Sequence, residues 1–115
     1  MSYNLCLHID SRDPATLRLL LKNAANYYKA LPDEKFQLVI VANGPAVCQF
    51  TNTNTEMNAL AAPLLEKGMQ INLCANALAE NQIAKNEIWS GCAVVPAGVV
   101  EIVRLQQQGF AYIKP

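Results

Sequence analysis

The chain has 115 residues and a formal net charge of zero, and only 16% of its residues are charged, against about 25% in an average globular protein. Balanced and scattered charges exclude the basic face of a nucleic-acid-binding protein, and no apolar run approaches the roughly 20 residues that span a bilayer. The opening segment MSYNLCLHID lacks the basic and apolar regions of a signal peptide, so we expect a cytoplasmic protein, and its weakly charged surface favours a homo-oligomer.

The first part of the chain alternates between strand-like and helical patterns. Residues 3–9 form a β-favouring run, and Asp13 followed by Pro14 is typical of a helix N-terminus. Apolar residues then recur at helical spacing as far as Leu31, which precedes a proline and is therefore pushed out of the helical conformation. The continuous apolar run 36–42 predicts a strand that is covered on both faces.

A second helix is expected after the turn NGPAV. Thr53 and Glu56 have the spacing of a capping box, and Gly68 is a natural C-terminal stop. Pro63 lies inside this helix, where a proline removes a hydrogen bond and clashes with the preceding turn. We therefore expect a kink at this proline, or two short helical pieces.

The remaining chain repeats the alternation of strand and helix. Residues 69–75 predict a third strand, and Asn76 is the expected N-cap of a short helix after it. The irregular segment around Trp89 is expected to cover an exposed edge or to contact another subunit. A fourth strand in CAVVPAG, a helix from Pro96 to Gly109 and a last strand in FAYIKP complete the order.

This order indicates an α/β fold in one domain of residues 1–115, with a mostly parallel sheet covered by helices on both faces. Ligands bind such open sheets at the carboxyl ends of the strands. Three turns are expected at that edge: HIDSRD, ANGPAV and CANALA. They contain no phosphate-binding glycine motif, and a receiver-type phosphoacceptor site would need acidic residues where the chain has Asn43 and Pro96.

Cys74 is the candidate for chemistry at this edge, because it ends the third strand where a helix begins. Unpaired N–H groups and the positive end of the helix dipole favour the thiolate there over the thiol. A thiolate exposed in a cleft is a nucleophile and a sulfur carrier. The alternative is that Cys74 is a small apolar residue at the end of a buried strand.

The other thiols and the histidine support weaker hypotheses. Cys48 follows the NGPA turn and is a candidate second thiol in the cleft, while Cys6 is expected in the core and Cys92 in a structural role. His8, near the end of the first strand, either assists thiolate formation or is a hydrogen-bonded packing residue. These residues are too scattered for a metal site, and a disulfide framework is not expected in a reduced compartment.

The runs LVIVANGPAV, GMQINLCANAL and VVPAGVVEIVRLQQQGFAYIKP, in this order, resemble the DsrE/DsrF-like family over nearly the whole chain. The resemblance implies a three-layer α/β/α sandwich around a mainly parallel five-stranded sheet, assembled into dimers, trimers or hexamers. In the sulfur-relay branch of the family, a cysteine after the third strand accepts sulfur as a persulfide and passes it to a partner protein, and Cys74 matches that position. That branch has a basic residue and a glycine further along the turn, where this chain has Glu80 and Asn81.

Three functional hypotheses follow. The first is a sulfur carrier between donor and acceptor proteins, in which Cys74 attacks a persulfide or disulfide sulfur without any cofactor or metal. The second is a non-enzymatic binding module, in which Cys74 lines a small-ligand pocket between subunits. The third is a redox sensor, in which Cys74 and Cys48 form a reversible disulfide. The residues expected to line or assist the pocket are His8, Asn43, Gly44, Pro45, Cys48, Asn76, Pro96 and Gly98.

Overall fold

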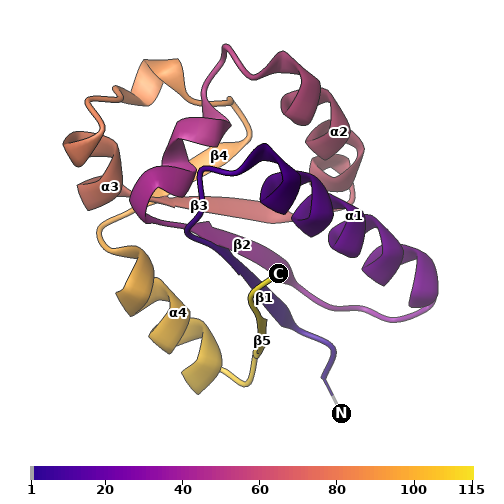
Figure 1. Cartoon of the computed structure of the whole chain (residues 1–115). Coiled ribbons are helices and arrows are strands. Elements are labelled where there is room, and N and C mark those ends of the chain that lie inside the picture. The colour runs from indigo at the N-terminus through magenta and orange to yellow at the C-terminus, as the bar shows by residue number, and fades with distance from the viewer. Residues whose placement is uncertain (1) are drawn as a thin grey trace.

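The computed structural model describes residues 2–115, which form one five-stranded sheet whose paired strands are all parallel (Figure 1). The strands lie in the spatial order β4-β3-β2-β1-β5. Their bounds are β1 (Leu5–Ile9), β2 (Leu38–Ala42), β3 (Gln70–Cys74), β4 (Cys92–Val95) and β5 (Ala111–Ile113). The mainly parallel α/β sheet predicted from the sequence is therefore confirmed.

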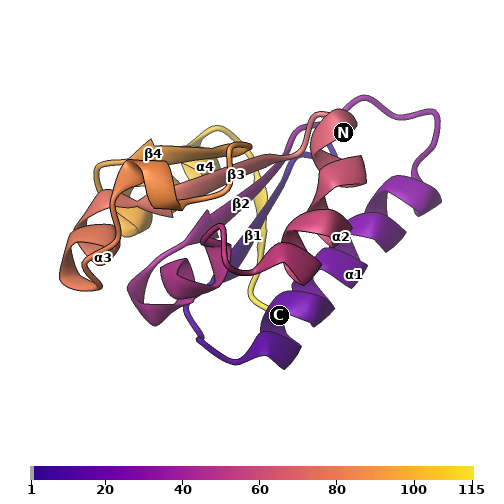
Figure 2. The ribbon, with the colours of Figure 1, turned by 90° about the horizontal axis from the view of Figure 1, so that it is seen from above.

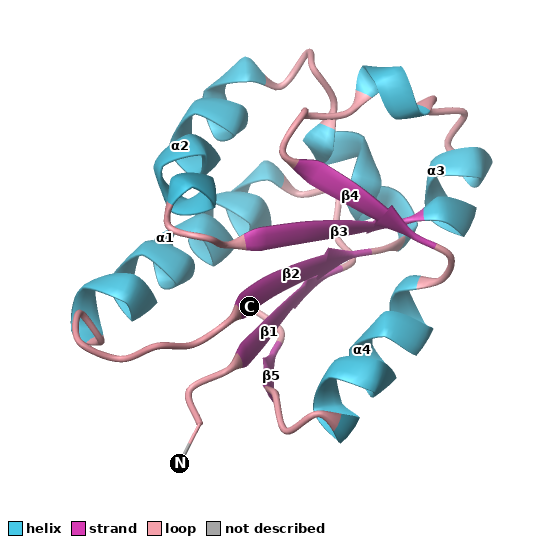
Figure 3. Cartoon of the chain, turned by 180° about the vertical axis from the view of Figure 1, so that it is seen from behind, coloured by secondary structure: helices cyan, strands magenta, loops and turns pink. Residues whose placement is uncertain are grey.

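Helices cover both faces of this sheet. Within residues 2–115 they are α1 (Pro14–Ala30), the 3-10 helix η1 (Gly44–Phe50), α2 (Thr55–Glu66), α3 (Ala75–Glu80), the 3-10 helix η2 (Lys85–Glu87) and α4 (Gly98–Gln107). Figures 2 and 3 show α1 and α2 on one side of the sheet and α4 on the other, which gives the three layers expected. None of the helices in this described part of the chain is long and apolar enough to cross a bilayer.

Burial on both faces explains the continuous apolar runs of the inner strands. Every residue of β1 and β2 is buried. The paired residues Leu7 and Ile40 belong to the larger core cluster, which also includes side chains of α1 and α2. The next pair, Cys6 and Val39, belongs to a smaller cluster with residues of α4, because side chains alternate between the faces of a strand. Cys6 is thus a core residue, as predicted.

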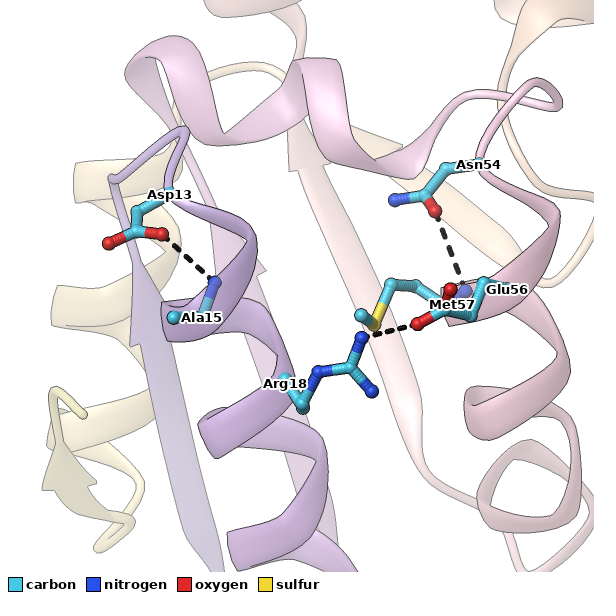
Figure 4. Close-up of polar contacts among 6 residues, drawn as sticks. All are labelled: Asp13, Ala15, Arg18, Asn54, Glu56 and Met57. Carbon is cyan, nitrogen blue, oxygen red and sulfur yellow. Dashed lines mark hydrogen bonds and ion pairs between the residues drawn. The ribbon is translucent and has the colours of Figure 1, made fainter.

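The N-termini of α1 and α2 differ in how well the sequence predicted them. In α1 the Asp13 side chain accepts a hydrogen bond from the Ala15 N–H at 3.0 Å, as expected of an N-cap (Figure 4). In α2 the N-cap is Asn54, whose side chain accepts from the Met57 N–H, so the prediction of Thr53 is wrong. The Thr53 hydroxyl instead shares a hydrogen bond of 2.8 Å with the hydroxyl of Thr51.

Of the two outcomes expected at Pro63, the one with two separate helical pieces is wrong, because α2 is one continuous helix from Thr55 to Glu66. Proline lacks the N–H that would bond the carbonyl four residues earlier, at Ala59. Both Pro63 and Ala59 lie on the exposed side of α2, where water satisfies a free carbonyl. The helix therefore tolerates the proline.

The start of α3 differs from the prediction as well. Asn76 is not the N-cap but the second residue of the helix, and it is exposed. The N-cap position is taken by Cys74, whose side chain makes no capping hydrogen bond. Strand and helix therefore share this cysteine, with no loop between them.

Trp89 is a core residue and covers no exposed edge, which corrects the prediction. Its ring is completely buried, lies 5.0 Å from the ring of Phe50, and donates its indole N–H to the Thr51 carbonyl at 2.8 Å. A bridge between Thr51 and Ile88 draws this segment against η1 and turns the indole inward. The burial of Trp89 thus follows from a contact between segments far apart in the sequence.

We predict that Trp89→Ala lowers the free energy of unfolding by about 3–5 kcal/mol, because it leaves a large cavity in the core. Urea unfolding followed by circular dichroism measures this change. The control Leu19→Ala, whose side chain is 48% exposed on α1, should alter stability by no more than about 0.5 kcal/mol. Equal losses in the two variants would contradict the buried position of Trp89.

Candidate functional site

Parallel strands bring their carboxyl ends to a single edge of the sheet. Ile9 at the end of β1 pairs with Ala42 at the end of β2, and Cys74 at the end of β3 pairs with Val95 at the end of β4. The loops that follow these strands are therefore neighbours, as the sequence predicted for an open α/β sheet.

Cys74 lies at the junction of β3 and α3 and is only 7% exposed. Its side chain belongs to the larger core cluster, although the backbone has already reached the edge of the sheet. The expectation of a thiol exposed in a cleft is therefore wrong: Cys74 lies at the edge of the sheet, but its side chain is buried as at the end of a core strand. All four cysteines of the chain are free.

Gly98, the first residue of α4, brings the turn after β4 directly against Cys74. A Cβ atom added at Gly98 would lie 3.0 Å from the Cβ atom of Asn43 and 3.4 Å from that of Cys74. The φ angle of Gly98 is not positive, so the glycine is needed for this close approach and not for an unusual backbone conformation. Asn43 and Gly98, both predicted pocket residues, therefore meet at Cys74.

His8 is joined to the same group through Asn43. Its Nε2 atom lies 2.8 Å from Oδ1 of Asn43, and its Nδ1 atom lies 2.6 Å from the hydroxyl of Tyr112. An amide oxygen only accepts hydrogen bonds, so Nε2–H is the donor, and Nδ1 of the neutral ring accepts from the Tyr112 hydroxyl. Both ring nitrogens are thus engaged, and His8 has no hydrogen bond to Cys74 but holds the neighbouring Asn43. We call His8, Asn43, Cys74 and Gly98 the Cys74 cluster.

The other predicted pocket residues lie at this edge but contribute less to the cluster. Gly44 adopts a positive φ of 54° at the start of η1, and the next residue, Pro45, is exposed. Pro96 is exposed and lines a cavity of about 330 Å³ together with Val100 and Arg104 of α4. Asn76 points away from the core on α3.

Cys48 lies in η1 and has a different environment. It is half-buried, and its Sγ atom accepts a hydrogen bond from Nη2 of Arg12 at 3.3 Å. The same sulfur donates to Oδ1 of Asn81 at 3.4 Å. Asn81 is the C-cap of α3, whereas Cys74 is its N-cap, so the two thiols adjoin opposite ends of this helix.

The remaining two thiols are poorly suited to nucleophilic chemistry. Burial, with a smaller effect of the Glu101 carboxylate, raises the pKa of the Cys6 thiol to about 11. Burial alone raises the pKa of the Cys92 thiol to about 12. Both stay protonated at neutral pH, and the thiolate is the reactive form. Cys48 and Cys74 are therefore the thiols of interest at this edge.

A buried polar network that the sequence analysis missed fixes α4 to the sheet. Asn72 of β3 donates to Oε2 of Glu101 at 2.9 Å, and Arg104 donates to both carboxylate oxygens of Glu101 at 2.7 and 2.8 Å. The Arg104 hydrogen bond is the largest cause that lowers the pKa of Glu101, against the opposing effect of burial. The sign of this network in the sequence was Asn72, a polar residue inside the apolar run of β3.

Among residues 2–115, no three His, Cys, Asp or Glu side chains are arranged to hold a metal ion. Tyr112, Arg12 and Asn81 were also missed as site residues, because each reaches its partner from a distant part of the chain.

Comparison with known proteins places this arrangement in context. The DsrE/DsrF-like family pattern matches residues 6–115. MTH1491, a protein of unknown function from Methanobacterium thermoautotrophicum, is 30% identical, with a TM-score of 0.91 over 99% of this chain and 100% of that chain. The ychN protein from E. coli shares the fold, with a TM-score of 0.72 and 12% identity over the full length of both chains. None of the curated protein sequences matches this chain.

We predict that Gly98→Ala lowers the free energy of unfolding by about 1–3 kcal/mol, because the added methyl group must displace Asn43 or Cys74. The loss is expected even though alanine is the better helix former. Urea unfolding followed by Trp89 fluorescence measures it, with Gln106→Ala, an exposed residue of α4, as the control. A Gly98→Ala protein as stable as the control would contradict the close contact.

Proposed function

The chain belongs to the DsrE/DsrF-like family, and from that premise we propose that it is a sulfur carrier that accepts sulfur as a persulfide on Cys74. The observation that supports the proposal best is the position of Cys74 at the β3–α3 junction, against Asn43 and Gly98. In this position, Cys74 lies close to both the turn after β2 and the turn after β4.

The proposed reaction is an exchange between thiols and persulfides. The Cys74 thiolate attacks the terminal sulfur of a donor persulfide, the donor's S–S bond breaks, and the donor leaves as a thiolate. Cys74 then carries one additional sulfur atom, which the thiolate of an acceptor protein removes in the same way. Oxidation states balance within each exchange, so the reaction needs no separate oxidant or metal.

The surrounding residues would guide the sulfur atom in this reaction. The missing side chain at Gly98 brings the turn after β4 close to Cys74, and Tyr112 and His8 hold Asn43 on the other side. Because Cys74 is almost covered and Gly98 packs closely against Asn43, the donor can reach the sulfur only when these two loops move apart. We expect the acceptor to use the same approach.

A specific observation favours the alternative, a binding module in which Cys74 is only part of a pocket wall. Cys74 belongs to the apolar core cluster and its side chain makes no capping hydrogen bond. These are also the properties of a packing cysteine. The two functions differ in one respect: only the sulfur carrier requires the sulfur atom of Cys74 to react.

We also propose that copies of this chain associate through the outer face of α4. Val99, Val100 and Val103 are each more than half exposed there, and Tyr112 and Ile113 of the edge strand β5 are exposed as well. Burial of apolar surface drives association, and a chain without net charge has little long-range repulsion between copies.

We predict that Cys74→Ser abolishes sulfur acceptance from a small persulfide donor, because the hydroxyl cannot form a persulfide. Intact-protein mass spectrometry measures the fraction of protein that has gained one sulfur atom. Cys48→Ser is the matched control at the same edge and should accept sulfur as well as the wild type. Undiminished acceptance by Cys74→Ser would favour the binding module instead.

We predict that Val100→Lys shifts the protein toward the monomer, because it places a charge in the apolar face of α4. Size-exclusion chromatography with light scattering measures the molar mass. Leu60→Lys is the control, since Leu60 is also an exposed apolar residue but lies on α2. A monomeric wild type, or an unchanged mass for Val100→Lys, would refute association through α4.

A further inference from the structure

A cavity of about 510 Å³, with charged and polar side chains in a partly apolar lining, lies on the side of the sheet that carries α1 and α2. It forms where the loop before α1, the helix η1 and the first turn of α2 meet. Its lining includes Arg12, Arg18, Cys48, Thr51, Thr53 and Glu56, and no member of the Cys74 cluster. This cavity is therefore separate from the proposed sulfur-carrying thiol.

The charged side chains of the cavity leave one positive charge without a counterion. Arg18 reaches from α1 to the first turn of α2 and pairs with Glu56, as Figure 4 shows. Arg12 has only neutral partners, the Cys48 sulfur at 3.3 Å and Oδ1 of Asn81 at 3.4 Å. From residue 2 to the C-terminus, no carboxylate forms an ion pair with Arg12.

The acidic residues nearest to Arg12 in the sequence are already engaged. Asp10 pairs with Lys114 at 3.0 Å, and Asp13 caps α1. The hydrogen bonds to Cys48 and Asn81 hold the Arg12 guanidinium at the cavity, between the loop after β1, η1 and the end of α3. Within residues 2–115, Arg12 thus presents to the cavity a guanidinium that is held in place by hydrogen bonds and forms no ion pair.

We propose that this cavity binds a small organic oxyanion, with the Arg12 guanidinium as its main anchor. Guanidinium groups match the geometry of carboxylate and phosphate oxygens. The hydroxyls of Thr51 and Thr53 supply further polar contacts, and the first turns of α1 and α2 at the rim favour negative charge. The volume lies in the range of about 300–1,000 Å³ typical of small-molecule sites, which exceeds the need of a bare ion.

Cys48 is a built-in reporter of this site, because its sulfur contacts Arg12 and lines the cavity. Iodoacetate and iodoacetamide alkylate the same thiolate, but only iodoacetate carries a carboxylate. The ratio of their rates at Cys48 therefore measures the preference for an anion and cancels any effect of Arg12 on the thiolate itself. Mass spectrometry of the Cys48 peptide gives both rates.

We predict that Arg12→Gln lowers this ratio about three- to fivefold, the effect of one partly exposed charge. Lys22→Gln on α1, a cation outside this cavity, should leave the ratio at the wild-type value. Succinate or glycerol phosphate should slow the labelling of Cys48 by iodoacetamide in the wild type but not in Arg12→Gln. Protection by one of the two compounds alone identifies a carboxylate or a phosphate as the preferred group.

An unchanged ratio in Arg12→Gln would overturn the proposal, as would equal protection by sodium chloride at the same ionic strength. Should Cys48 react too slowly to follow, calorimetric titration with the same two compounds decides instead. Binding by the wild type that Arg12→Gln loses supports the site, and no binding by the wild type overturns it. Neither result depends on whether Cys74 carries sulfur.

Discussion

The contact of Gly98 with Asn43 and Cys74 is the constraint on which the carboxyl edge of the sheet depends. Here α4 begins its passage from β4 at one edge of the sheet to β5 at the other. A side chain at this point would lift α4 away from the ends of β2 and β3. The helix leads to β5, where the Tyr112 hydroxyl forms a hydrogen bond with His8, and His8 forms one with Asn43. These contacts therefore connect the start of α4, strand β5, strand β1 and the turn after β2.

The same edge presents two thiols with different chemical surroundings. Cys74 lies among apolar groups at one end of α3, close to Gly98, which has no side chain. Cys48 adjoins the other end of α3, beside a guanidinium and an open cavity with charged side chains in its lining. The proposed sulfur transfer would use the first environment, and the proposed recognition of an anion would use the second.

The sequence predicted the features that depend on local pattern. The apolar run of β2 and the Asp13–Pro14 start of α1 needed no knowledge of distant residues. The position of Cys74 between strand and helix followed from the same reasoning. Its contact with Gly98 was not predictable from spacing alone, because that contact depends on where α4 crosses the sheet.

The error at Trp89 and the missed Arg12 contacts share a physical cause, which is a partner far along the chain. Trp89 is buried because its segment pairs with η1, and nothing in its neighbouring residues shows this. Pro63 is a separate, local case: α2 continues through it because its side of the helix is exposed. The Arg12 contacts join three separate segments, none of which has a distinctive motif.

The most direct test of the account is to map where the reduced wild-type protein carries sulfur after exposure to a small persulfide donor. Alkylation would trap each persulfide, and mass spectrometry of the peptides would locate it. The account predicts one additional sulfur atom, confined to the peptide that contains Cys74. Sulfur on Cys48, or spread over several cysteines, would contradict it.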